Sequence, residues 1–140
     1  MKPLFTKIDC LSLPVDDLDK ALAFYQHTLG HELVWRDELA AGLRLPDSSA
    51  ELVLHLDPRP PEVDLMVDSV PDAVERFCQA GGHRVHGPFP IRIGLCAVVV
   101  DPWGNRLVLL DASKGLLQTD GDARVIGNVD AGPGPARCQK

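Results

Sequence analysis

Hydrophobic positions along the chain alternate between a spacing typical of strands and one typical of helices. Residues 7–15 (KIDCLSLPV) are apolar at alternate positions, which predicts a strand with one covered face. From Leu18 onward the apolar residues recur every three to four positions, which predicts a helix with Asp16 or Asp17 as its N-cap. Gly30 is placed to end that helix in a left-handed turn. Three short strands then follow, at 32–37, 39–45 and 51–57.

The second half of the chain repeats this pattern. Shifted by 52 positions, residues 15–33 fall on residues 67–85, with identical or similar side chains at the apolar positions. A repeat of this length indicates one supersecondary unit used twice. The second unit is predicted as a strand at 62–68, a helix at 71–80 and strands at 83–87, 93–100 and 105–111. Each unit therefore has the order βαβββ, in an α+β fold.

The two units define the domain organisation that we expect. They span about 5–57 and 60–111, within one domain of residues 1–114. In the extension at 115–140, the TDGDA turn predicts a small hairpin from Leu116 to Ile126. The glycine- and proline-rich end, DAGPGPARCQK, is predicted to be disordered.

Charge and cysteine content exclude several classes of function. The formal net charge is −6 and no stretch clusters Lys and Arg, so a nucleic-acid partner is not expected. The acidity would favour a cationic or neutral ligand, but a solubilising surface is the preferred explanation for it. None of the four cysteines forms a C-x-x-C pair. No apolar stretch has the length of a signal peptide or a membrane helix, so we expect a cytoplasmic protein with reduced thiols and no membrane contact.

Several motifs in a fixed order give the sequence a family resemblance. VDDL and VDSV precede the two helices, FY and LG stand near the end of the first helix, and DPWGN precedes the last strand. With the two βαβββ units, this order resembles the vicinal oxygen chelate superfamily, which includes glyoxalase I, extradiol dioxygenases and bleomycin-resistance proteins. The resemblance covers about residues 5–114. It implies a curved, barrel-like mixed sheet around a cleft, and, as in many short members, a homodimer.

The resemblance also implies where a metal would be held. Enzymes of the superfamily bind a divalent metal through His or Glu on the first and last strands of each unit. Those positions correspond here to Cys10, Val53, Glu62 and Val108. A valine offers no lone pair, and catalytic metals normally take three or more protein ligands, so no metal is expected in the usual manner. The alternative is an improvised site of Cys10, His55 and Glu62 for a divalent metal such as Zn, Ni, Mn or Fe.

Strand alternation predicts which side chains face the cleft. If Cys10 points inward, the same face carries Ser12, Glu51, Val53, His55, Glu62, Asp64, Met66, Arg106, Val108 and Leu110. From this set, the residues predicted to form the ligand-binding cleft are Cys10, Ser12, Val53, His55, Glu62, Asp64, Arg106 and Val108. Glu62 is expected either to have its proton affinity raised by an apolar cleft or to form an ion pair with Arg106. Trp35 and Trp103 are expected to be core or rim aromatics.

These residues favour one function and leave two others open. The leading hypothesis is a glyoxalase/bleomycin-resistance-like protein that captures a small organic ligand without catalysis and without a cofactor. The alternative is a lyase or isomerase, either metal-dependent through Cys10, His55 and Glu62 or metal-free with Glu62 or His55 as the base. A third reading is an interaction module whose cleft is vestigial.

Overall fold

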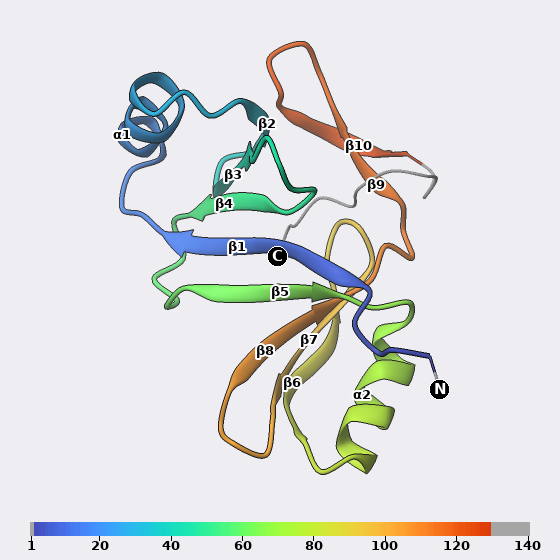
Figure 1. Ribbon diagram of the computed structural model, residues 1–140. Helices are drawn as coiled ribbons and strands as arrows, with labels where there is room; N and C mark the ends of the chain where they lie inside the picture. The colour runs from blue at the N-terminus through green and yellow to red at the C-terminus, as the bar shows by residue number, and fades with distance from the viewer. Residues whose placement is uncertain (1, 130–140) are drawn as a thin grey trace.

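A curved mixed sheet forms the body of the molecule (Figure 1). The computed structural model describes residues 2–129. The strands of the first half are β1 (Lys7–Pro14), β2 (Leu33–Arg36), β3 (Ala40–Arg44) and β4 (Glu51–His55). Those of the second half are β5 (Glu62–Met66), β6 (His83–Pro90), β7 (Leu95–Val100) and β8 (Arg106–Leu110). The eight strands lie in the order β2-β3-β4-β1-β5-β8-β7-β6, so the predicted α+β fold with a curved sheet is confirmed.

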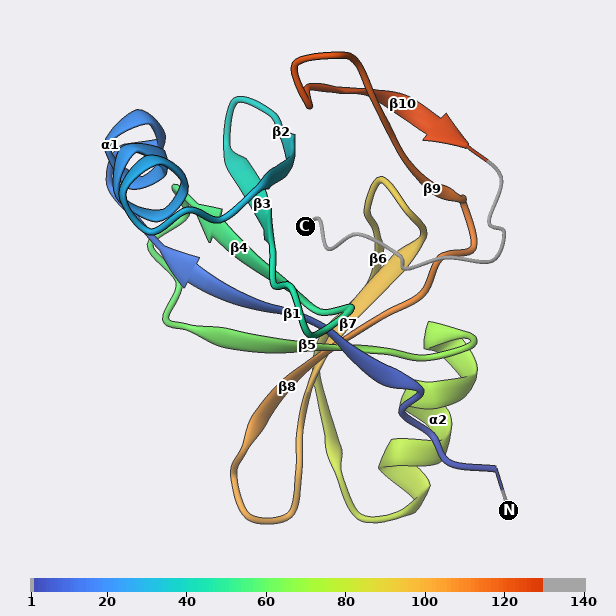
Figure 2. The ribbon, with the colours of Figure 1, turned by 45° about the horizontal axis from the view of Figure 1, so that its top comes forward.

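The order of the strands shows the internal repeat directly. In the first half β1 pairs with β4 in parallel, and in the second half β5 pairs with β8 in parallel. The two halves join where β1 and β5 run antiparallel in the middle of the sheet (Figure 2). Each half thus contributes four strands in the same relative order, as the predicted βαβββ units require.

The first helix departs from its prediction near its middle. It begins as α1 (Leu18–Leu22), where the side chain of Asp17 accepts a hydrogen bond from the Lys20 backbone N–H. It continues as a π-helix, η1 (Ala23–Thr28), rather than as the single regular helix that the spacing predicted. The Thr28 hydroxyl donates to the Ala23 carbonyl five residues earlier, which fits this wider turn. The apolar spacing is compatible with both helical forms, so it could not predict the change.

The second helix and both glycine turns follow the sequence more closely. Helix α2 (Val70–Gln79) is capped by Ser69, whose hydroxyl accepts from the Asp72 backbone N–H at 3.4 Å. Gly30 and Gly81 adopt φ of +86° and +109° after the two helices, a region that side chains other than glycine rarely enter. The left-handed turn predicted at Gly30 is therefore confirmed.

The core has three clusters, one under each helix on the outer face of the sheet and one on its inner face. Helix α1 covers the outer face of β3 and β4 through Leu18, Leu22 and Leu54. Helix α2 covers the outer face of β7 and β8. The third cluster lines the inner, concave face. Between the two helices the outer face of β1 and β5 remains uncovered, and Ile8 and Leu11 are exposed there.

A second, smaller sheet follows the last strand of the repeat. Strands β9 (Leu116–Thr119) and β10 (Val125–Val129) form a hairpin around the predicted turn. Its first strand contributes the buried Leu117 to the concave-face cluster. The segment predicted to be disordered, residues 130–140, lies outside the described residues. Among residues 2–129, neither helix has the length and apolar character needed to cross a bilayer.

Candidate functional site

A cavity of about 600 Å³ opens on the concave face of the sheet, where the two halves meet. Its walls are mainly apolar and come from both halves, with Trp35 and Val53 on one side and Phe89, Val98 and Val108 on the other. A smaller number of polar side chains complete the lining: Ser12, His55, Asp57, Arg59, Glu62, His86 and Arg106. Apolar walls with a few polar groups are the usual composition of a small-molecule pocket.

The structure brings six of the eight predicted cleft residues to this cavity. They are Ser12, Val53, His55, Glu62, Arg106 and Val108. The other two, Cys10 and Asp64, are both fully buried on the same face, as predicted, but lie further along β1 and β5 and do not line the cavity. Glu51 is also buried, at 6% exposure, so it is not a solvated rim residue.

Ser12 lies at the centre of the cavity floor. In the register of the sheet it stands opposite Val53 on one side and Glu62 on the other. Its side chain is buried, and its hydroxyl has no hydrogen-bond partner among residues 2–129. Because a buried hydroxyl without a partner costs about 1–3 kcal/mol, this hydroxyl is a group that a bound molecule would satisfy.

Glu62 is engaged by a different arginine from the one expected. Its Oε1 accepts from Arg59 Nη1 at 3.1 Å, and Arg59 Nε lies 2.9 Å from Asp57 Oδ2. The expected ion pair of Glu62 with Arg106 is therefore not formed. Arg59 stands only three residues before Glu62, in the connection between β4 and β5. Because the two residues are so close in sequence, the ion pair of Glu62 with Arg59 costs less chain entropy than one with Arg106 would.

Asp9 is a buried carboxyl that the sequence pattern did not reveal. A bulge between Ile8 and Cys10 shifts the register of β1 and turns Asp9 away from solvent. Neither carboxyl oxygen has a hydrogen-bond partner among the described residues. Burial, followed by the nearby carboxylates of Glu51 and Asp64, raises the pKa of Asp9 to about 8, although Lys7 acts in the opposite direction. Strict alternation from an inward-facing Cys10 would put the Asp9 side chain on the outer face, so only the bulge accounts for its burial.

Trp35 fixes the wall of the cavity beside β4. It is completely buried, and its indole Nε1 donates to Glu51 Oε1 at 2.7 Å. The indole packs over Gly42, where a Cβ atom would stand 2.1 Å from Nε1. The absence of a side chain at Gly42 is thus what admits the ring.

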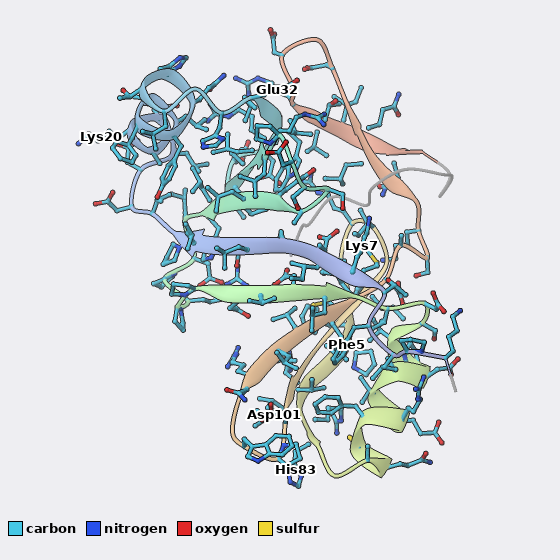
Figure 3. The ribbon with its side chains drawn as sticks, viewed as in Figure 1. Phe5, Lys7, Lys20, Glu32, His83 and Asp101 are labelled. Atoms are coloured by element: carbon cyan, nitrogen blue, oxygen red, sulfur yellow. The ribbon has the colours of Figure 1, made fainter. Side chains whose placement is uncertain are left out.

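Trp103, by contrast, is 84% exposed in the turn between β7 and β8, so its expected place in the core or at the cavity rim is wrong. That turn also contains Asp101, which Figure 3 shows at the end of the second half, away from β1.

The positions implied for a metal do not supply a ligand set. Val53 and Val108 are buried with their hydrocarbon branches facing the concave side, and no group of three His, Cys, Asp or Glu side chains in the described residues has a geometry that would hold an ion. The improvised set is not brought together either. His55 stands opposite Pro14, four residues along β1 from Cys10, a separation of about 13 Å along the strand. Cys10 is also disulfide-bonded, so the expectation of reduced thiols is wrong for this residue.

Comparison with known proteins identifies the family. The model of the Glyoxalase/Bleomycin resistance protein/Dioxygenase superfamily matches residues 7–109, so the chain belongs to this superfamily. No curated protein sequence matches the chain.

Solved structures share the fold. Methylmalonyl-CoA epimerase from Mycobacterium tuberculosis is similar with a TM-score of 0.64 and 22% identity, over 79% of this chain and 91% of that one. A hypothetical protein from Bacillus halodurans has a TM-score of 0.63 and 17% identity, over 75% and 93%. Homoprotocatechuate 2,3-dioxygenase from Brevibacterium fuscum, in complex with 3,4-dihydroxyphenylacetate, has a TM-score of 0.57 and 25% identity. The match covers 79% of this chain but only 37% of the dioxygenase.

Proposed function

We propose that this protein binds a small organic molecule in the cavity between its two halves, and that it does so without the metal typical of the family's enzymes. The observation that carries the proposal is the buried, unpartnered hydroxyl of Ser12, among residues 2–129, at the floor of a cavity with apolar walls. A volume of about 600 Å³ suits a ligand of drug-like size. The apolar walls supply affinity, and Ser12 gives the ligand one orientation.

The chemistry of the four metal-ligand positions supports the metal-free part of the proposal. Val53 and Val108 contribute only hydrocarbon, and Glu62 is committed to the guanidinium of Arg59. Cys10 lies outside the cavity lining, and a single sulfur would in any case be too few ligands for a catalytic ion. Metal analysis of protein purified without chelator tests this part. Stoichiometric metal that is lost in Glu62→Ala would overturn it.

Binding itself is tested with a neutral apolar probe, N-phenyl-1-naphthylamine, whose fluorescence rises in an apolar environment. The wild type should bind one equivalent, because an apolar cavity of this size accommodates the probe. Val53→Phe fills the cavity from its wall and should abolish binding. Val85→Phe is the matched control, since Val85 is an exposed valine of β6 that lies outside the cavity lining. Failure of the wild type to bind, or equal binding by the two variants, would contradict the proposal.

The presence of two ionisable side chains in the cavity supports a second candidate, a metal-free lyase or isomerase. His55 and Glu62 both line the cavity, so either is placed to take a proton from a bound ligand. A base of this kind would exchange a C–H proton of a bound ligand with D₂O, and His55→Gln or Glu62→Gln would stop the exchange. Ligands that bind without exchange support the non-catalytic proposal.

The homodimer remains a prediction. Its support is the uncovered outer face of β1 and β5, where Ile8, Leu11 and Val63 are exposed next to one another on the paired strands. A second copy of the chain would cover this face through a self-complementary contact. Light scattering after size exclusion should give twice the chain mass, and Leu11→Glu should give a monomer.

A further inference from the structure

Arg106 is a charged group of the cavity that has no acidic partner among the described residues. It lines the cavity from the first position of β8 and is exposed at its mouth. In the part of the chain that the structure describes, its guanidinium makes neither a hydrogen bond nor an ion pair. It therefore differs from Arg59, the other arginine of the lining, which is held between two carboxylates.

The ion pairs of Arg59 leave the guanidinium of Arg106 able to bind a ligand. Glu62 begins β5, next to β8, and is the cavity carboxylate placed to reach Arg106. Its carboxylate is instead turned to Arg59, with Oε1 and Nη1 3.1 Å apart. Asp57 is bound to the other side of the same guanidinium. Both acidic groups of the lining thus contact Arg59, and the guanidinium of Arg106 keeps its N–H donors unpaired at the cavity mouth among residues 2–129.

Polar and apolar parts of the cavity are also separated in space. His86 pairs with Val98 across the sheet, and Val98 pairs with Val108, so the three side chains form a row from the mouth to the wall. The ring of His86 packs on Phe89 with centroids 4.8 Å apart, which fixes the imidazole at the rim and leaves the Phe89 ring as wall. The cavity therefore has mainly apolar walls, the buried polar groups of Ser12, His55 and Glu62 inside, and the exposed nitrogen donors of His86 and Arg106 at its mouth.

We propose that the ligand is an amphipathic carboxylate: an aryl or alkyl body held by the apolar walls, with its carboxylate bound by Arg106 and His86 at the mouth. This inference rests on the proposed function and specifies its ligand class. A guanidinium presents two parallel N–H donors that match the two oxygens of a carboxylate. The inference also departs from what the net charge of −6 suggests, because the two arginines of the lining balance its two carboxylates, and the one left unpaired among the described residues is Arg106.

Three ligands with the same body test the inference: 4-phenylbutyrate, 4-phenylbutanol and 4-phenylbutylamine, compared by calorimetry at low salt. The wild type should prefer the carboxylate over the alcohol by about fivefold, as expected for a partly exposed charged hydrogen bond. The amine should bind least. Arg106→Gln should remove the preference by weakening the carboxylate alone. Arg124→Gln is the matched control, because Arg124 is an exposed arginine that does not line the cavity.

A second variant tests the role given to Arg59. In Arg59→Gln the carboxylate of Glu62 loses this guanidinium and can turn to Arg106, so affinity for 4-phenylbutyrate should fall while affinity for 4-phenylbutanol is kept. The outcomes separate the two proposals. Equal binding of the three ligands to the wild type, or an unchanged preference in Arg106→Gln, would overturn the carboxylate inference and leave the binding function intact. Absence of binding by all three, together with failure of the neutral naphthylamine probe, would overturn the binding function itself.

Discussion

The buried carboxyl of Asp9 should make the stability of the protein depend on pH in a defined direction. In the unfolded chain an aspartate ionises near its ordinary pKa of 3.8, whereas in the folded protein its pKa is about 8. Between these values the folded state holds a proton that the unfolded state has lost. Stability therefore falls as pH rises from about 4 to about 8, and this contribution is constant above that range.

The size of the effect follows from the same pKa values. One proton of difference between the two states is worth about 1.4 kcal/mol for each pH unit. Asp9 alone should thus lower the free energy of unfolding by on the order of 4 kcal/mol between pH 4 and pH 7. That is a large part of the 5–15 kcal/mol, roughly, that holds a typical domain folded. Glu51 and Asp64 face Asp9 and add to the cost of its charge, while Lys7 offsets part of it.

Asp9→Asn isolates this contribution, because an amide of the same shape cannot ionise. The free energy of unfolding is measured by urea titration at each pH from 5 to 9, with circular dichroism as the signal. The free energy of unfolding of the variant, relative to that of the wild type, should rise by about 1.4 kcal/mol per pH unit up to about pH 8. Above that pH the difference should stay constant. Asp16→Asn, on the exposed surface, controls for the loss of one negative charge. A difference between Asp9→Asn and the wild type that is the same at pH 5 and pH 8 would refute the reasoning.

Three further substitutions test other parts of the structure. Gly42→Ala places a methyl group against the buried indole of Trp35 and should cost about 2 kcal/mol, with a change in tryptophan fluorescence as the indole moves. Asp111→Ala removes the acceptor of the Val70 and Leu95 backbone N–H groups and should lower the free energy of unfolding by about 3 kcal/mol, whereas retention of full stability would show that these bonds are replaced. Trp103→Ser, in an exposed turn, should change the unfolding free energy by no more than about 0.5 kcal/mol, and a larger loss would contradict its solvent-exposed position.

Alternation along the strands was enough to predict the concave face. The period of two placed Ser12, Val53 and Val108 on one surface, and the structure has all three there. The internal repeat predicted that both halves have the same order of elements, because one supersecondary unit is used twice. These features depend only on local spacing, which a single sequence contains.

Features that depend on register or on competition between partners were not predictable. The bulge in β1 adds one residue to the strand, and it is this extra residue that brings Asp9 inside. Glu62 pairs with Arg59 rather than with Arg106 because of the path of the connection after β4. The spacing of hydrophobic residues in the sequence does not predict that path. The contact of Trp35 with Glu51 likewise requires knowing that Gly42 leaves room for the ring.

The segment that joins the halves is also part of the cavity wall. Asp57, Pro58 and Arg59 all lie in the short connection from β4 to β5, and all three line the cavity. Connections of this kind tolerate insertions and deletions far better than the strands they link. A change in the length of this one loop would therefore reshape the cavity while the strand pairings stayed in place. Chains that share this sheet could thus acquire differently shaped cavities through a handful of loop residues.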